Sequence, residues 1–101
     1  MQLTSKAIRF LRSMAHTLKP VVIIGGNGIT AGVIKELDSA LAHHELIKIK
    51  VNAGDRAARQ AMIEDLCAQT AAAHVQSIGH IAVLYRPAKK PVITLPSASA
   101  N

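Results

Sequence analysis

The clearest chemical signal in the chain is a short glycine loop, Gly25-Gly26-Asn27-Gly28. It follows an apolar run over residues 21–24, which is typical of a buried strand, and it precedes Thr30, whose hydroxyl can cap a helix. A strand, a glycine loop and a helix in this order direct free backbone amides and the positive end of a helix dipole toward one point. The natural occupant of that point is an anion, usually a phosphate group.

Three kinds of phosphate-binding loop share features with this segment. A nucleoside-triphosphate loop needs Lys and then Ser or Thr after its last glycine, whereas Ile29 and Thr30 follow Gly28. A dinucleotide fingerprint matches the spacing of Gly26, Gly28 and Ala31, but the acid expected after the next strand is absent and the chain is short for that fold. A G-x-x-G loop that clamps a nucleic-acid backbone needs only close approach and flanking positive charge, and both are present. We favour this third interpretation over a tight turn that binds nothing.

Positive charge is in excess, with 12 Lys and Arg against 6 Asp and Glu and a formal net charge of +6. Such an excess favours a polyanionic partner, either nucleic acid or an anionic membrane surface. Lys6, Arg9 and Arg12 lie opposite the apolar face of the first predicted helix, and no acidic residue precedes Glu36. The imbalance favours a binding face over a merely solvated one.

Five further cations are candidate phosphate ligands. Lys48 and Lys50 share one face of a predicted strand, where protection of an edge against aggregation is the alternative role. Arg56 and Arg59 begin the third predicted helix, where cations oppose the helix dipole and a ligand role would explain them. Arg86 is placed to contact either a phosphate or the end of the sheet.

Few residues in the chain suit other chemistry. Phe10 and Tyr85 are the only aromatic residues, which argues against an aromatic platform that stacks single-stranded bases. Cys67 is the single cysteine and fits a helix core, and no Cys/His spacing resembles a zinc cage. No nucleophile triad or carboxylate pair stands out. We therefore expect no enzymatic activity, no metal, no cofactor and no small-molecule substrate.

Three helices and four strands are predicted to position these residues. The helices span about residues 5–17, 31–43 and 56–70, with Thr4, Thr30 and Asp55 as their caps. The first helix has its apolar face at Ala7, Phe10, Leu11, Met14 and Leu18. The strands span residues 21–24, 46–51, 80–86 and 92–95, the last two as a hairpin joined by residues 87–91. Residues 74–79 fit either a helix end or an extra strand.

The predicted fold is an α/β domain of the α+β type in the order α-β-α-β-α-β-β. Short connections around the helices imply parallel neighbours, and the last strand pair should be antiparallel, which gives a four-stranded mixed sheet packed with three helices. We expect one domain over residues 1–97 and a disordered tail over residues 98–101. No apolar run is long enough to cross a bilayer and no signal peptide is visible, so we expect a cytoplasmic protein without a membrane partner.

Several motifs in order along residues 3–96 resemble the CRM domain (chloroplast RNA splicing and ribosome maturation). The glycine loop and the two residues after it look like that family's G-K-N-G-L-T-type loop. The other matching motifs are Leu11-Arg12-x-x-Ala15-His16-x-Leu18-x-Pro20, Lys48-Ile49-Lys50-Val51, Ile78-Gly79-His80 and Leu84-Tyr85-Arg86-Pro87. A free-standing bacterial CRM domain of this length is similar to the YhbY family.

The resemblance implies a fold like the C-terminal domain of bacterial translation initiation factor three. It also implies RNA binding, and association with ribosomal RNA in precursors of the large ribosomal subunit. Gly26 stands where the family loop often has a basic residue, so neighbouring Lys and Arg should take over part of the phosphate contact. A small nucleotide-binding enzyme or subunit using the Gly26-Gly28-Ala31 fingerprint is the alternative, and an adaptor for a ribosomal protein is a third.

Overall fold

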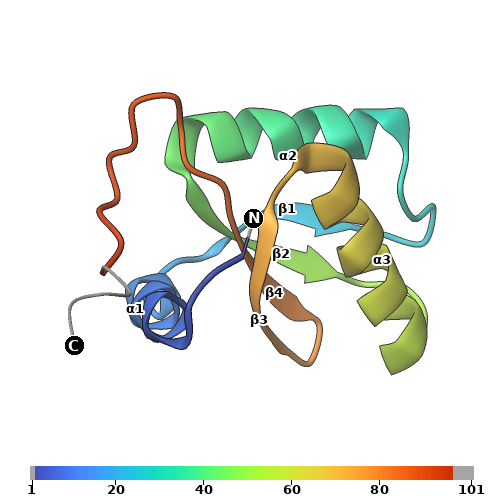
Figure 1. Cartoon of the computed structure of the whole chain (residues 1–101). Helices are drawn as coiled ribbons and strands as arrows, with labels where there is room; N and C mark the ends of the chain where they lie inside the picture. The colour runs from blue at the N-terminus through green and yellow to red at the C-terminus, as the bar shows by residue number, and fades with distance from the viewer. Residues whose placement is uncertain (1, 97–101) are drawn as a thin grey trace.

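The computed structural model describes residues 2–96, which form one four-stranded mixed sheet and three helices (Figure 1). Along the chain the elements are α1 (Ser5–Ala15), β1 (Pro20–Ile24), α2 (Ala31–His44), β2 (Leu46–Val51), α3 (Arg56–Thr70), β3 (Ala73–Ile78) and β4 (Ile81–Tyr85). The strands lie in the spatial order β1-β2-β4-β3, with β1 parallel to β2 and the other two pairs antiparallel. The predicted class and order of elements are confirmed.

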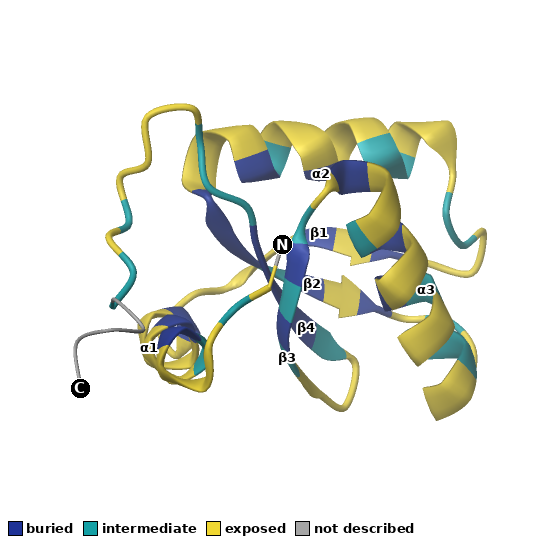
Figure 2. Cartoon of the chain, viewed as in Figure 1, coloured by how far each residue is buried: buried dark blue, intermediate teal, exposed yellow. Residues whose placement is uncertain are grey.

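The sheet separates two apolar cores. Because side chains alternate along a strand, Ile47, Ile49 and Val51 of β2 enter the core beneath α2 and α3, while Leu46 enters the core beneath α1. Figure 2 shows the buried positions gathered between the sheet and the helices, with the outer surface of α2 exposed. Among the described residues, α1 is the only helix on its face of the sheet.

All three helices begin at the predicted caps. The side chains of Thr4, Thr30 and Asp55 accept hydrogen bonds from the amide three residues further on, at 3.0, 3.1 and 2.8 Å. Each bond satisfies one amide that the first helical turn leaves without a partner. The helix starts are thus set by contacts that lie within four residues of sequence.

The prediction that the first strand is buried on both faces is wrong. Val22 and Ile24 are buried, but Val21 is 49% exposed and Ile23 is 62% exposed. The strand β1 is at the edge of the sheet, and α1 packs mainly against β2 and β3 rather than over it. Four consecutive β-branched residues therefore predicted the strand correctly. They did not show that only one face of this strand is covered by other elements.

The predicted apolar face of α1 is also shifted. Phe10, Met14 and Leu18 are each at least 36% exposed. The residues of α1 that the core buries are Ala7, Leu11 and Ala15. At about 100° per residue, Phe10 and Met14 lie to one side of the arc centred on Leu11, and the helix ends before Leu18. Because the face centred on Leu11 points toward the sheet, Arg9 and Arg12 lie on the other flank of the helix.

The hairpin predicted between residues 80–86 and 92–95 is wrong. The strand β4 pairs instead with β3, so the open question over residues 74–79 resolves as a strand through Ile78. Residues 92–95 form no strand. Proline at 87 and 91 removes two ladder donors, and the amides of Val92 and Ile93 donate to the Glu45 carboxylate, each at 2.9 Å.

Glu45 holds the segment after β4 through a carboxylate clasp. Its buried carboxylate accepts hydrogen bonds from the amides of Ala88, Val92 and Ile93, at 2.8, 2.9 and 2.9 Å. The Ala88 amide is the main cause that lowers the pKa of the Glu45 carboxyl, and the other two amides add to it while burial opposes them. Held in this way, Ile93 and Leu95 pack against the core beneath α1.

Gly54 has the least room among the glycines of the described chain, and its replacement tests how tightly α3 begins. Its φ is +70°, and a Cβ there would lie 2.6 Å from the Cβ of Ala58. We expect Gly54→Ala to lower the free energy of unfolding by about 2 kcal/mol. Gly25→Ala, where a Cβ meets nothing within 4 Å, should change it by less than about 0.5 kcal/mol. Urea unfolding measures the free energy of unfolding of both variants. Equal losses would contradict the conclusion that a side chain at residue 54 conflicts with Ala58.

Candidate nucleic-acid interface

The glycine loop is exposed at one end of the sheet. The amide of Gly28 donates to the carbonyl oxygen of Gly25 at 3.0 Å, which closes the turn, and Gly28 has a φ of +67°. Gly25, Gly26 and Asn27 are exposed, and no atom lies within 4 Å of a Cβ placed on either of the first two. The loop backbone is therefore open to a ligand, as the phosphate hypothesis requires.

Two other turns lie at the same end of the sheet. The amide of Asn52, just after β2, donates to the carbonyl oxygen of Ile24 at 2.7 Å, which joins the turn after β2 to the end of β1. The amide of Val51 donates to the carbonyl oxygen of His80 at 2.8 Å, and Nδ1 of His80 lies 2.9 Å from the carbonyl oxygen of Val51. The glycine loop, the turn after β2 and the β3–β4 turn thus form one edge of the molecule.

A basic groove of about 750 Å³ opens between α1 and the part of the sheet that α1 leaves uncovered. One wall is the polar flank of α1, and the floor is made by β2, β3 and β4. The residues that line this groove are Arg9, Arg12, Ser13, Ala15, His16, Lys48, Gln76, Ile78, Ile81 and Val83. The Lys48 Nζ donates to the carbonyl oxygen of His16 at 3.4 Å, which places its charge against the end of α1.

Three of the predicted cations converge in the basic groove. Arg9 and Arg12 come from α1 and Lys48 from β2, 36 residues further along the chain than Arg12. Neither arginine forms an ion pair with any residue in the described range 2–96. No acidic residue lines the groove. Uncompensated positive charge over an open concave surface attracts anions from solution.

The remaining predicted cations lie around the groove or on a second hollow. Lys50 is exposed two residues beyond Lys48 on the same sheet face, and Lys6 is exposed on α1 outside the groove lining. Arg56 and Arg59 line a hollow of about 360 Å³ that also includes Ser77 near the end of β3 and Gly79 of the β3–β4 turn. The Arg59 Nη1 donates to the carbonyl oxygen of Gly54 at 3.0 Å, so part of its guanidinium is already used.

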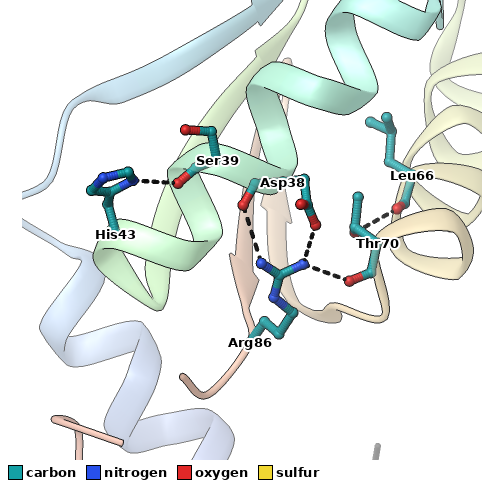
Figure 3. A network of polar contacts seen from close by, with 6 residues as sticks. All are labelled: Asp38, Ser39, His43, Leu66, Thr70 and Arg86. Carbon is teal, nitrogen blue, oxygen red and sulfur yellow. Dashed lines mark hydrogen bonds and ion pairs between the residues drawn. The ribbon is translucent and has the colours of Figure 1, made fainter. Parts of the chain in front are cut away.

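Arg86 lies at the opposite end of the sheet from the glycine loop. Its Nη1 donates to Oδ1 of Asp38 and, at 3.0 Å, to the carbonyl oxygen of Thr70, and its Nη2 donates to the carbonyl oxygen of Asp38 at 3.1 Å. Figure 3 shows the guanidinium between α2 and the end of α3. With its side chain 21% exposed, Arg86 fastens three elements. The sequence predicted that Arg86 contacts either a phosphate or the end of the sheet. These contacts support the second role.

The described residues offer little for metal or nucleophile chemistry. Over residues 2–96, no group of three or more His, Cys, Asp and Glu side chains could hold a metal ion. Burial raises the pKa of the Cys67 thiol to about 11, and the charge of Glu64 adds to the rise, so this thiol stays protonated at neutral pH. In the same range, none of the helices is both long and apolar enough to cross a membrane.

The floor of the basic groove was not predicted. Gln76, Ile78, Ile81 and Val83 belong to the strand pair that the sequence left uncertain. A register shift between His74 and Gln76 breaks the alternation of β3, which removed the usual strand pattern. The signal that could have located the floor was the glycine at residue 79, since a short turn there joins two strands of similar length.

Comparison with known proteins adds to this geometry. A sequence profile of the CRS1/YhbY (CRM) domain matches residues 3–86. An RNA-binding protein of Haemophilus influenzae is 52% identical over 94 residues, which cover 93% of this chain and 95% of that protein. A probable RNA-binding protein of Pseudomonas aeruginosa is 46% identical and covers 90% and 88% of the two chains. The solution structure of a Staphylococcus aureus protein matches with a TM-score of 0.82 and 38% identity, over 94% of this chain and all of that one.

Proposed function

The chain belongs to the CRS1/YhbY (CRM) domain family, and from this premise we propose that it binds RNA and acts by binding rather than by catalysis. Two of its relatives are named RNA-binding proteins. The observation that supports the same role here is the convergence of Arg9, Arg12 and Lys48 in one open groove without an acidic neighbour. Phosphate contacts by such cations supply most of the affinity of proteins for nucleic acid backbones.

The glycine loop provides a second contact for the RNA backbone. Its exposed main chain and the first turn of α2, which Thr30 caps, direct amide groups and a positive dipole end outward. Lys50 lies on the sheet face between the groove and this edge, and Arg56 lies beside the β3–β4 turn. An RNA strand can therefore contact positive groups from α1 to the glycine loop.

A dinucleotide site at the same loop is less well supported. The fingerprint Gly26-x-Gly28-x-x-Ala31 works in a sheet of several parallel strands, where the ligand crosses their carboxyl ends. Here β1 pairs in parallel with β2 alone and lies at the sheet edge. We therefore retain RNA as the partner.

The specific partner that we propose is ribosomal RNA in precursors of the large ribosomal subunit. We also propose that the protein acts in the cytoplasm. The resemblance of the ordered motifs to the CRM and YhbY families supports it, together with the net charge of +6. Ultraviolet crosslinking of the protein in cells, followed by sequencing of the bound RNA and gradient sedimentation, tests this assignment. We expect enrichment of large-subunit ribosomal RNA in fractions of immature particles. Recovery of all cellular RNAs in proportion to their abundance would contradict it.

Gly26→Lys should strengthen RNA binding, because it adds a basic side chain where the loop of the CRM domain that this segment resembles often has one. A Cβ at Gly26 meets nothing within 4 Å, and the position does not have a positive φ, so the fold should tolerate lysine. One added phosphate contact should raise affinity by about three- to fivefold and steepen the salt dependence by roughly one unit. Fluorescence anisotropy with labelled RNA measures both, and Gly26→Gln controls for size. Equal effects of Lys and Gln would argue against a phosphate near this loop.

A further inference from the structure

The floor of the basic groove has a different chemistry from its rim. Ile78 is 67% exposed and pairs with Ile81, which is partly exposed on the same face of the β3–β4 pair, while Val83 is only 3% exposed and closes the floor beside them. Large apolar side chains that stay in water next to cations are unfavourable unless a ligand covers them. A regular RNA duplex presents phosphates and sugars to a protein and keeps its bases stacked inside, so it would satisfy the rim and leave this floor uncovered.

We propose that the basic groove binds an unpaired nucleotide of the RNA, with its base against Ile78 and Ile81 and its phosphates against Arg9, Arg12 and Lys48. This inference rests on the proposed RNA-binding function and specifies the class of RNA. That class is single-stranded segments, loops and bulges rather than continuous duplex.

The groove has the features that an unpaired nucleotide requires. Its volume of about 750 Å³ lies within the range of roughly 300–1,000 Å³ that small-ligand sites occupy. The planar guanidinium groups of Arg9 and Arg12 can stack on a base as well as pair with a phosphate. Gln76 contributes an amide with both donor and acceptor groups for a base edge. Positive charge on the rim and apolar surface on the floor together match a phosphate joined to a base.

This arrangement also accounts for the scarcity of aromatic side chains. Tyr85 is buried in the core beneath α1, and Phe10 does not line the groove. In the proposed complex, aliphatic side chains and the planar guanidinium groups of arginine take the place of an aromatic platform. The sequence already argued against such a platform. The aliphatic and guanidinium groups contact only the face of a base, and Gln76 is the one amide side chain in the groove lining that can reach a base edge, so preference among the four bases should be small.

A matched pair of surface variants tests the proposal. Ile78→Ser removes exposed apolar surface inside the groove, and Val92→Ser removes it from an 85% exposed side chain outside the groove. Fluorescence anisotropy compares a 12-nucleotide unstructured RNA with a 12-base-pair RNA duplex. We expect Ile78→Ser to weaken single-strand binding about fivefold and duplex binding less than twofold, and Val92→Ser to change neither. Equal losses on both RNAs, or none, would overturn the groove assignment while leaving RNA binding in place. Failure of the unmodified protein to bind either RNA would overturn the proposed function itself.

Photocrosslinking of the unmodified protein gives an independent test that does not depend on a variant. RNA that carries 4-thiouridine reacts with side chains in contact with the base. We expect crosslinked peptides to include residues 76–83. Crosslinks confined to residues 25–28 would show that bases contact the glycine loop instead, and would overturn the groove assignment.

Discussion

Replacing Arg9, Arg12 and Lys48 together by alanine is expected to weaken RNA binding by roughly 30- to 100-fold at moderate salt. The three side chains line one groove from two elements, so their removal eliminates a continuous set of phosphate contacts. The slope of log K against log salt concentration should become shallower by about two to three units. Anisotropy titrations at four or more salt concentrations measure both quantities. Both arginines are exposed, and the half-buried Lys48 makes one long hydrogen bond, to the carbonyl oxygen of His16 at 3.4 Å, so the fold should survive; thermal unfolding checks this.

A second triple variant separates groove geometry from net charge. Lys35, Lys89 and Lys90 are exposed and do not line the basic groove, so their replacement by alanine removes the same three charges from elsewhere. We expect this variant to lose less than about threefold in affinity, because distant exposed charges are screened within roughly 8 Å at physiological salt. Similar losses in the two triple variants would mean that overall charge, not the groove, determines binding.

Glu45→Ala is expected to lower the free energy of unfolding by about 3 kcal/mol. The variant removes three charge-assisted hydrogen bonds and leaves the amides of Ala88, Val92 and Ile93 without that acceptor. The segment after β4 should then separate from α1, since Ile93 and Leu95 pack on the core beneath that helix. Urea unfolding measures the stability, and hydrogen exchange at residues 88–93 measures the opening. Glu36→Ala, an exposed acid of α2, is the control and should change little.

The clasp also predicts how stability depends on pH. The pKa of the Glu45 carboxyl is lowered in the folded state, mainly by the Ala88 amide. Such a carboxyl stabilises the fold at pH values above its unfolded pKa, and the contribution is lost as the pH falls through the folded pKa. Stability should therefore decline on acidification below about pH 4.5, and Glu45→Ala should decline less over that range. Parallel pH profiles of the two proteins would contradict the clasp.

Short-range patterns predicted most of the fold. The caps at Thr4, Thr30 and Asp55 act within one helical turn, so they were visible in the sequence and are confirmed. The strand at 46–51 was also predicted correctly, because its alternating side chains reflect local geometry. The hairpin over 80–95 was wrong because its competing partner, the Glu45 carboxylate, is more than 40 residues away in sequence.

The candidate site divides in the same way. The glycine loop and the stripe of Arg9 and Arg12 were chosen from residue type and spacing, and their RNA-binding roles stay predictions. Residue type alone could not separate Arg86 from the other cations, although its guanidinium fastens Asp38 and Thr70 at the far end of the sheet. Arg86 differs from the other cations because its hydrogen-bond acceptors come from α2 and α3, which are distant in sequence.

The sequence by itself determined the three helices with their caps, the first two strands and the excess of positive charge, because each can be predicted from composition or from residues that are neighbours along the chain. What the tertiary structure decided was which cations share a surface and what lies between them. Lys48, Arg9 and Arg12 line the same groove as the apolar residues of its floor. The groove is open because α1 covers only part of its sheet face. That extent is set by packing between distant segments, which no local pattern encodes.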